Sequence, residues 1–583
     1  METLRYILAF NAESPLLFTQ FYFWAFFALV FALFALIMEG VPDRLGNKKL
    51  HLRNIYLLFV SWFFYYKTSG LFLLILAFIT ISDWLIARRI QNSDVSIRKK
   101  LWLTLSVVID LSLLFYFKYA YFFTNVINSW FGADFRVFDI FAYVGNGFAT
   151  SGRFSVDTIV LPVGISFYIF QVISYTCDVF RKKIEPVKNI LDFGFYVSFF
   201  PQLVAGPIVR AEEFIPQLYK PYRLSRRAFG IAVFWIINGL AKKIIMSDYL
   251  AVNLIDRVFD NPLLFSGFEN LFALFAYSLQ VYADFSGYTD IAIGVAMLMG
   301  FYLPMNFNSP YKSQSPQEFW RRWHMSLGRW LKGYLYIPLG GNRTILGFKA
   351  KKLWASNFNS FITQVLGGLW HGASWNFVLW GAINGAGMIV EKIWRETNWH
   401  LRMVSITALT VSLFAADYIW ALPVWRLFAV WSLIIWVGTF IRYVYWLCKG
   451  TDNKFTKGAA TAWAIAQTFT FITFTRLFFR SSSNLDPATA NEVAWRTAKN
   501  MVNQIGGAWS NAIIPDFLWA YRWVVLMFVA GMIIHWLPTN WKRRYRLWFT
   551  AMPVWAIVIA VCVAIVIIYQ FVTADMQPFI YFQ

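Results

Sequence analysis

Long apolar stretches recur along the chain from residue 16 to residue 572, with no long polar gap between them. Because about 20 mainly apolar residues in a helix span the hydrocarbon core of a bilayer, this pattern predicts a polytopic membrane protein. The composition agrees, since 59% of the 583 residues are hydrophobic and only 14% are charged, whereas about a quarter are charged in soluble domains. We therefore predict an all-α fold that forms a single membrane domain over residues 1–583.

The basic residues predict how the chain threads the membrane. The net charge of +22 comes from short Lys and Arg clusters between the apolar stretches. Such clusters mark cytoplasmic loops, so the charge reflects topology and not a nucleic-acid partner. Both termini, the loop 480–513 and the tail 573–583 are then predicted outside the cytoplasm. About twelve crossings follow, namely the first apolar stretch and residues 54–67, 71–87, 101–127, 159–180, 228–250, 268–300, 402–421, 423–447, 460–479, 516–537 and 549–572.

Some segments are predicted not to cross. The apolar segments 191–219 and 360–391 each lie between basic loops, so we expect them to enter and leave on the cytoplasmic face. Thr68, Ser69 and Gly70 are expected to form the outer tip of a hairpin between two crossings. A surface helix is expected after Asp486 and Pro487 in the outer loop.

Polar side chains within an apolar stretch are functional candidates, because each costs about 3 kcal/mol near the bilayer centre. Residues 282–290 place Asp284, Ser286 and Asp290 in the middle of a predicted crossing. Together with Gly287, they predict that this helix breaks around a cavity lined by protein. A polar network that only holds helices together is the alternative.

A second polar segment begins at Ser315. Glu318 three residues later, and Pro316 at the first helical position, predict the start of a helix. Its apolar stripe would consist of Phe319, Trp323, Leu327, Trp330 and Tyr334, with Arg322 and Arg329 on another stripe. This pattern is typical of an amphipathic helix in the membrane interface. It does not account for His324 beside the stripe, so His324 is a candidate site residue.

A third polar segment surrounds His371. If the segment is helical, one face consists of Gln364, Gly367, Gly368, His371, Ser374 and Trp375. The glycines would allow close approach of another chain or a ligand, and Trp370 and Trp375 would form aromatic walls. Burial disfavours the charged imidazole, so His371 could accept a proton as a general base. A hydrogen-bonded core histidine is the alternative.

Other chemistries lack their sequence signals. The five histidines show no metal-ligand spacing, and the chain contains neither a nucleophile elbow nor a phosphate-binding loop. A zinc hydrolase and an ATP-driven pump are therefore not expected.

Several motifs together resemble the membrane-bound O-acyltransferase family. They are Tyr282–Gly294, Asn308–Arg343 and Leu369–Trp375, and Pro201–Arg210 is similar to the bacterial branch that O-acetylates alginate and peptidoglycan. The resemblance implies a catalytic core over residues 50–390 with helices around a central tunnel, to which residues 391–583 add C-terminal helices.

The resemblance also implies roles for individual residues. His371 would be the catalytic histidine, and His324 would lie near the reacting thioester. As substrate-binding and tunnel residues we ourselves predict, from the polar segments and motifs above, Asp284, Ser286, Asp290, Asn308, Trp320, Arg321, Arg322, Trp323, Gln364, Trp370, Ser374 and Trp375. No bound cofactor is expected, because acetyl-coenzyme A or a carrier-protein acyl thioester would act as the donor at the basic cytoplasmic face, Lys312–Lys352.

The last seven residues resemble a tyrosine motif of envelope acylation systems. Tyr581 would then relay the acyl group as an ester, although an aromatic residue at the membrane interface is the alternative. The expected function is O-acetylation of an extracytoplasmic polysaccharide across a bacterial inner membrane, aided by an extracytoplasmic acetyltransferase- or esterase-like partner. A D-alanyl transferase that uses a carrier-protein thioester and a secondary transporter are the alternatives.

Overall fold

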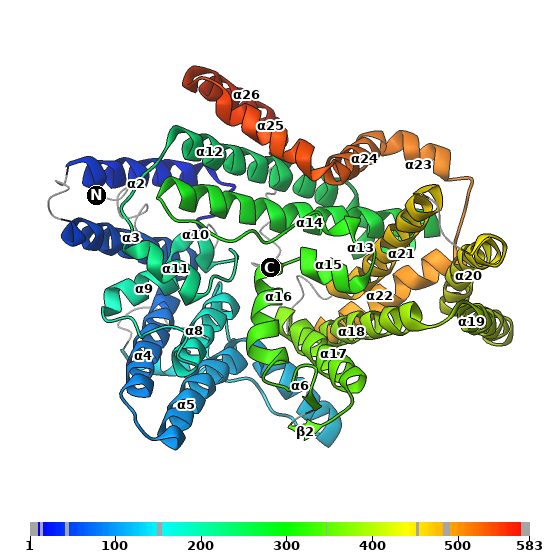
Figure 1. The fold of residues 1–583 in the computed structure, drawn as a ribbon, viewed down its shortest axis with the longest axis horizontal. Helices are drawn as coiled ribbons and strands as arrows, with labels where there is room; N and C mark the ends of the chain where they lie inside the picture. Colours follow the sequence, from blue (N-terminus) through cyan, green and yellow to red (C-terminus); the bar gives the residue numbers. More distant parts are fainter. Residues whose placement is uncertain are drawn as a thin grey trace.

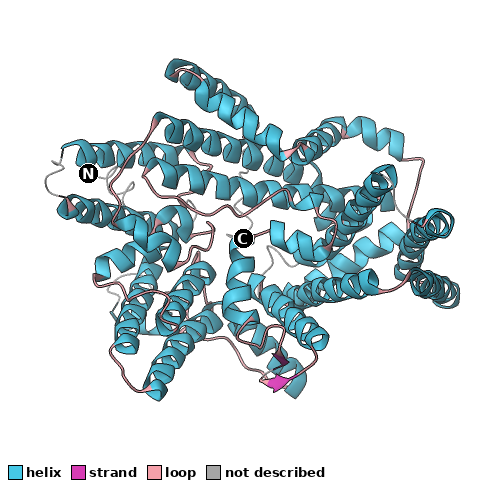
Figure 2. Cartoon of the chain, in the orientation of Figure 1, coloured by secondary structure: helices cyan, strands magenta, loops and turns pink. Residues whose placement is uncertain are grey.

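Helices make up almost the whole molecule (Figures 1 and 2). The computed structural model describes residues 10, 11, 15–40, 46–148, 154–345, 347–450, 454–481 and 490–572. Within these residues the one sheet is an antiparallel pair, β1 (Thr344–Ile345) and β2 (Phe348–Lys349). The predicted all-α fold is confirmed.

The N-terminal part packs in the lower left of Figure 1 and along its left edge. The turn predicted near Gly70 lies where α3 ends, and the positive φ of 59° at this glycine interrupts the helix before α4 begins. The elements are α2 (Phe21–Gly40), α3 (Asn47–Ser69), η2 (Gly70–Phe72), α4 (Leu73–Gln91), α5 (Ser96–Leu114), the π-helix η3 (Phe115–Tyr119), α6 (Ala120–Phe131), α7 (Ile140–Phe148) and α8 (Ile165–Phe180).

The segment predicted to be re-entrant contains three short helices. They are α9 (Ile190–Ser198), α10 (Phe200–Leu203) and α11 (Ala211–Leu218). None is long enough to span a bilayer, and α9 and α10 are almost wholly buried. These helices therefore form part of the interior and not of the lipid-facing surface.

Two long helical stretches lie side by side across the upper part of Figure 1. The first consists of α12 (Arg226–Leu240), the π-helices η4 (Ala241–Asp248) and η5 (Ala251–Ile255), and α13 (Asp256–Asp260). After η6 (Pro262–Leu264) comes α14 (Gly267–Leu298). A Cβ on Gly239 would lie 2.5 Å from the Gly287 carbonyl oxygen, so glycine is needed where the two stretches meet.

The predicted break in the helix at residues 282–290 is wrong. α14 continues without interruption for 32 residues through Asp284 and Asp290. The helix need not unwind, because Lys243 pairs with Asp284 and Lys242 pairs with Asp290 from the facing stretch. The irregular backbone is instead in that facing stretch, where η4 carries both lysines.

The predicted helix start at Ser315 is confirmed, but the predicted length is wrong. The Ser315 side chain accepts a hydrogen bond from the Glu318 amide at 3.1 Å and begins α15 (Pro316–Arg322). The chain then turns at His324, which has a φ of 45°, before α16 (Met325–Leu331) begins. Flanking elements are η7 (Pro310–Lys312) and the π-helix η8 (Lys332–Tyr336). The apolar stripe is thus divided between two helices.

The segment 360–391 forms a helical hairpin of α17 (Lys352–His371) and α18 (Trp375–Glu396). Glycine allows the two helices to touch, since a Cβ on Gly381 would lie 2.4 Å from the Gln364 carbonyl oxygen. The single helical face predicted to run from Gln364 to Trp375 is wrong, because α17 ends at His371. Ser374 is instead the N-cap residue of α18.

The C-terminal helices occupy the right and upper edges of Figure 1. They are α19 (Trp399–Trp420), α20 (Pro423–Lys449), α21 (Lys454–Ser481), α22 (Ala490–Gly507), α23 (Ile514–Ala520), α24 (Arg522–Trp536), α25 (Thr539–Ala551) and α26 (Val554–Gln570). The helix expected in the outer loop is α22, and one side of it is buried. Asp486 and Pro487, which predicted it, lie outside the described residues.

The two last predicted crossings are not single straight helices. α23 and α24 are bent by 84°, and α25 and α26 by 117°. The second bend follows from the chemistry, because α25 is rich in Lys and Arg and Pro553 precedes α26.

Six described helical segments are long and apolar enough to cross a membrane, or up to eight if each bent pair is one span. This is fewer than the predicted twelve, partly because the predicted crossings 54–67 and 71–87 fall within one of the counted segments, Lys48–Gln91, where α3 and α4 adjoin through η2. Others, such as the 16-residue α8, are shorter than a span. The polytopic membrane class is nevertheless confirmed.

Candidate active site

Two histidines from separate segments meet in the interior. His324 lies at the turn between α15 and α16, and His371 is the last residue of α17. Their ring centroids are 6.4 Å apart. The two histidine motifs of the sequence are therefore neighbours in the folded chain.

His324 is fixed by one asparagine. Its Nδ1 lies 3.1 Å from Oδ1 of Asn306, which also accepts hydrogen bonds from the amide and hydroxyl of Ser326. The two Ser326 donors show that this atom of Asn306 is the amide oxygen and not the nitrogen. An oxygen only accepts, so the neutral His324 ring must carry its proton on Nδ1. Nε2, which has no hydrogen-bond partner within the described part of the chain, is then an acceptor. The positive φ of His324 is held by the same asparagine, whose carbonyl accepts from the Met325 amide at 2.9 Å.

Aromatic rings surround His371. The nearest are Trp370, Trp380 and Phe479, whose ring centroids lie 4.9, 5.2 and 5.5 Å from the imidazole. They come from α17, α18 and α21, so three helices enclose this histidine. His371 itself stays partly exposed between these rings, so a substrate can reach the imidazole while the apolar walls limit the access of water.

The π-helix η3 holds the end of the histidine helix. Lys118 Nζ donates to the carbonyl oxygen of Trp370 and to the Ser166 hydroxyl, and the Tyr119 hydroxyl donates to the Leu369 carbonyl at 2.8 Å. The last carbonyls of an α-helix have no partner within the helix and carry a partial negative charge. Lys118 and Tyr119 therefore supply hydrogen bonds to the last carbonyl groups of α17 and fix the position of His371.

The predicted aromatic residues divide into two groups. Trp370 lies beside both histidines. Trp320 does so only indirectly, because its ring centroid lies 5.5 Å from that of Trp380, which in turn contacts His371. Trp375 is 47% exposed and packs against Phe122 of α6 instead of His371. The second predicted wall is therefore supplied by Trp380.

The remaining residues of the two histidine segments lie around the site. Trp323 packs beneath the Arg476 guanidinium at 4.1 Å, Arg322 pairs with Glu318, and Arg321 is exposed. The Asn308 amide donates to the Arg322 carbonyl. In the hairpin, Gln364 donates to Met388 of α18, and the buried Ser374 hydroxyl oxygen has no partner within the described residues.

The polar residues of α14 face the α12–η4 stretch. Asp284 pairs with Lys243 and Asp290 with Lys242, whereas the buried Ser286 hydroxyl has no partner among the described residues. The histidine site meets α14 through Phe285, whose ring lies 4.8 Å from that of His324. Direct roles of these three polar residues in substrate binding stay predictions.

Sequence reasoning missed several residues of the site. Lys118 and Arg476 are charges within apolar stretches, a signal that could have selected them. Trp380 and Phe479 carry no such signal in a chain with 20% aromatic residues. Asn306 precedes the predicted helix by several residues, and it contacts the His324 ring only because the chain turns at His324.

Comparisons with known proteins match much of this chain. The membrane-bound O-acyltransferase family model matches residues 181–421, which include both histidines. A probable alginate O-acetylase of Azotobacter vinelandii is 41% identical over 345 residues, covering 59% of this chain and 64% of the relative. This chain thus spans slightly under two thirds of that relative's length.

Two further relatives extend the comparison. A peptidoglycan O-acetyltransferase of Helicobacter pylori is 31% identical over 444 residues, covering 71% of this chain and 76% of the relative. A teichoic acid D-alanyltransferase of Bacillus subtilis is 29% identical over 245 residues, covering 40% of this chain and 60% of the relative.

The chain belongs to the membrane-bound O-acyltransferase family.

Proposed function

We propose that this protein transfers an acetyl group from a cytoplasmic thioester to a hydroxyl group, for O-acetylation of an extracytoplasmic polysaccharide. The observation that carries the proposal is the pair of histidines, 6.4 Å apart within an aromatic enclosure. The names of the two relatives, an alginate O-acetylase and a peptidoglycan O-acetyltransferase, support acetyl as the acyl group. A bacterial inner membrane location with both termini outside the cytoplasm is part of the proposal.

The transfer is a balanced substitution at a carbonyl carbon. His371 accepts the proton of the acceptor hydroxyl while the oxygen of that hydroxyl attacks the thioester carbonyl. The new C–O ester bond forms, the C–S bond breaks, and the thiolate leaves and takes up the proton. His324, held by Asn306, contacts the reactants with its free Nε2. The donor is acetyl-coenzyme A or an acetylated carrier protein, and neither is a resident cofactor.

Reconstitution tests this function. Purified protein in liposomes is given labelled acetyl-coenzyme A, an acetylated carrier protein or a D-alanylated carrier protein, with alginate, cellulose or peptidoglycan as acceptor. We expect a base-labile acetyl ester on one polysaccharide, measured by mass spectrometry. If an extracytoplasmic acetyltransferase- or esterase-like partner completes the transfer, adding it should be required for this product.

The alternatives give different products in the same assay. The similarity to a teichoic acid D-alanyltransferase makes D-alanyl transfer the second candidate, and a D-alanyl ester would identify it. Solute uptake without thioester consumption would contradict acyl transfer and indicate a secondary transporter.

Tyr581 lies outside the described residues, and its part as an acyl relay stays a proposal. In this role its hydroxyl takes the acetyl group as an ester and then passes it to the polysaccharide. Tyr581→Phe removes only the hydroxyl, so polysaccharide acetylation should fall to background while the protein still inserts. Mass spectrometry of the wild-type protein after incubation with donor should find acetyl on Tyr581. The exposed Tyr569 supplies the control, Tyr569→Phe, and equal activity of both variants would contradict the relay.

A further inference from the structure

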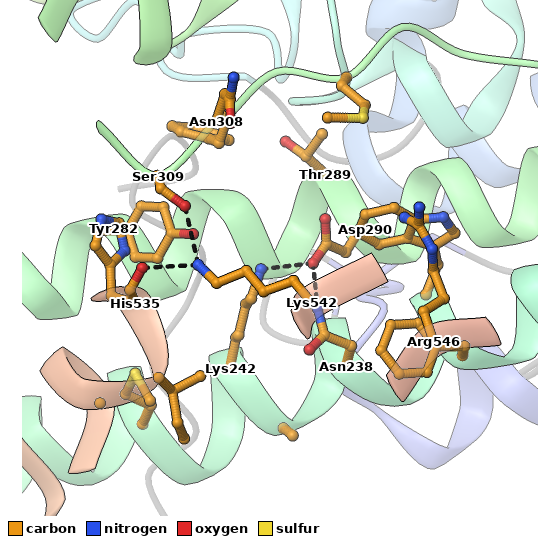
Figure 3. A pocket seen from close by; sticks show the side chains of 18 of the residues that line it. Asn238, Lys242, Tyr282, Thr289, Asp290, Asn308, Ser309, His535, Lys542 and Arg546 are labelled. Carbon is orange, nitrogen blue, oxygen red and sulfur yellow. Dashed lines mark hydrogen bonds and ion pairs between the residues drawn. The ribbon is translucent and has the colours of Figure 1, made fainter. Parts of the chain in front are cut away.

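A cavity lies beside Asn306, on the side of α14 that faces the C-terminal helices. Its volume is about 490 Å³. It lies between α12 and η4, α14, the segment 305–309, and the ends of α24 and α25 where these two helices join (Figure 3). This volume is in the range of small-molecule sites. The helices α24 and α25 lie outside residues 181–421, which the family model matches.

The cavity is strongly cationic. Lys242, Lys542, Arg543 and Arg546 line it, whereas Asp290 is its one carboxylate. Asp290 is already engaged by Lys242 at 2.7 Å and by Asn238 at 2.6 Å (Figure 3). Among the described residues, no carboxylate forms an ion pair with Lys542, Arg543 or Arg546 of α25. The site therefore has an excess of positive charge near a mostly apolar interior.

Neutral groups hold the cations in place. Lys542 Nζ donates to the His535 carbonyl oxygen at 2.7 Å and to the Ser309 hydroxyl at 2.9 Å (Figure 3). The Arg546 guanidinium lies 5.1 Å above the Trp235 ring, and its Nε has no hydrogen-bond partner within the described chain. These contacts orient the charges without neutralising them, which leaves them available to an anion.

Two buried residues of the lining have unused nitrogen atoms. Nδ2 of Asn306 has no partner among the described residues, and Asn306 is only 1% exposed. His535 is 3% exposed, and its Nε2 accepts from the Tyr311 amide, so the neutral ring has its proton on Nδ1. That Nδ1 makes no hydrogen bond of normal geometry, although the Ser309 carbonyl lies nearby. The buried Asn306 amide thus adds an N–H donor to the cations as a group that favours a bound anion, whereas the His535 N–H has the Ser309 carbonyl beside it.

The cavity is connected to the histidine site through one side chain. Asn306, which lines the cavity, accepts from His324 with its oxygen. Asn308, a predicted substrate residue, also lines the cavity. A ligand here would lie next to the residue that positions His324.

We propose that this cavity binds a phosphate-bearing ligand through Lys242, Lys542 and Arg546. Three cations opposite the single carboxylate of Asp290 leave an excess of about two positive charges, which matches a phosphate monoester better than a single carboxylate. The phosphate belongs either to coenzyme A or to the headgroup of an anionic phospholipid. Assigning it to the thioester donor rests on the proposed transfer reaction, whereas the phosphate site itself does not.

Binding to the purified full-length protein tests the proposal without turnover. Coenzyme A is measured by equilibrium dialysis, and retained phosphatidylglycerol is measured by native mass spectrometry after reconstitution in vesicles of that lipid. The double variant Lys542→Gln with Arg546→Gln should weaken binding by about tenfold or more, because each lost contact is a charge-assisted hydrogen bond. Lys542→Arg with Arg546→Lys keeps both charges and should retain most of the binding.

A matched control removes the same charge elsewhere. Arg98 and Lys100 are exposed at the start of α5, and Arg98→Gln with Lys100→Gln should bind as the wild type does. Binding of the lipid but not of coenzyme A would keep the phosphate site and reject the donor assignment. If the wild type binds neither probe, or if the control weakens binding as much as the cavity variant, the site is refuted. If the wild type binds coenzyme A but transfers no acetyl group, the proposed function is refuted and the phosphate site is kept.

Discussion

Replacing His371 with alanine is expected to lower the rate of acyl transfer by at least about 100-fold, the effect of removing a general base. The side chain lies in an aromatic enclosure of Trp370, Trp380 and Phe479. Among the described residues, His324 is the histidine whose ring lies beside that of His371, at 6.4 Å between centroids. The measurement is the initial rate of ester formation by purified protein in liposomes, at saturating thioester.

The control for this variant is His400→Ala. His400 lies on α19 and donates or accepts a hydrogen bond with the Tyr443 hydroxyl at 2.8 Å, in an exposed position. Its removal should leave the rate unchanged. Thermal unfolding in detergent checks that the His371 variant is folded. A folded His371→Ala protein with nearly normal activity would refute the mechanism.

Replacing Lys243 with methionine is expected to destabilise the protein by about 3–5 kcal/mol, because it leaves buried carboxylates without a counter-charge. Lys243 Nζ lies 2.6 Å from Asp284 and 2.8 Å from Asp248. The exposed fractions of the three side chains are 4%, 5% and 7%. The expected observation is a large fall in the thermal unfolding temperature, with loss of activity at temperatures where the wild type is folded.

A triple variant separates charge from packing. Lys243→Met combined with Asp284→Asn and Asp248→Asn removes the whole ion cluster, so most of the lost stability should return. Asp284→Asn alone also decides the function of this residue, which the sequence placed in the substrate tunnel. If that variant remains stable but inactive, Asp284 acts on the substrate. If stability and activity fall together, its role is structural.

The sequence predicted the parts of the site that depend on local composition. His371 and His324 were selected because polar residues are rare and costly in apolar stretches, and the N-cap at Ser315 was selected because its hydrogen bond reaches only three residues. The glycines of the hairpin were also evident, although the partner they approach was not. Each of these signals is contained within one or two helical turns.

The errors arose where a distant residue overrides the local pattern. The apolar stripe after Ser315 favours one helix, but Asn306 accepts hydrogen bonds from His324 and Ser326 and stabilises a turn instead. Polar residues in α14 favoured a broken helix, but Lys242 and Lys243 satisfy them from outside. Hydrophobic periodicity within a segment cannot predict such partners, because they come from other parts of the chain.

The sequence by itself determined that this is a helical membrane protein and which two histidines are candidates for chemistry, because burial in lipid restricts both the backbone and the choice of polar side chains. Only the tertiary structure decided that the histidines lie 6.4 Å apart, that Lys118 fixes the end of α17, and that α25 brings its cations to a cavity beside Asn306. Those contacts join residues far apart in the chain, and their geometry is set by how helices pack against one another.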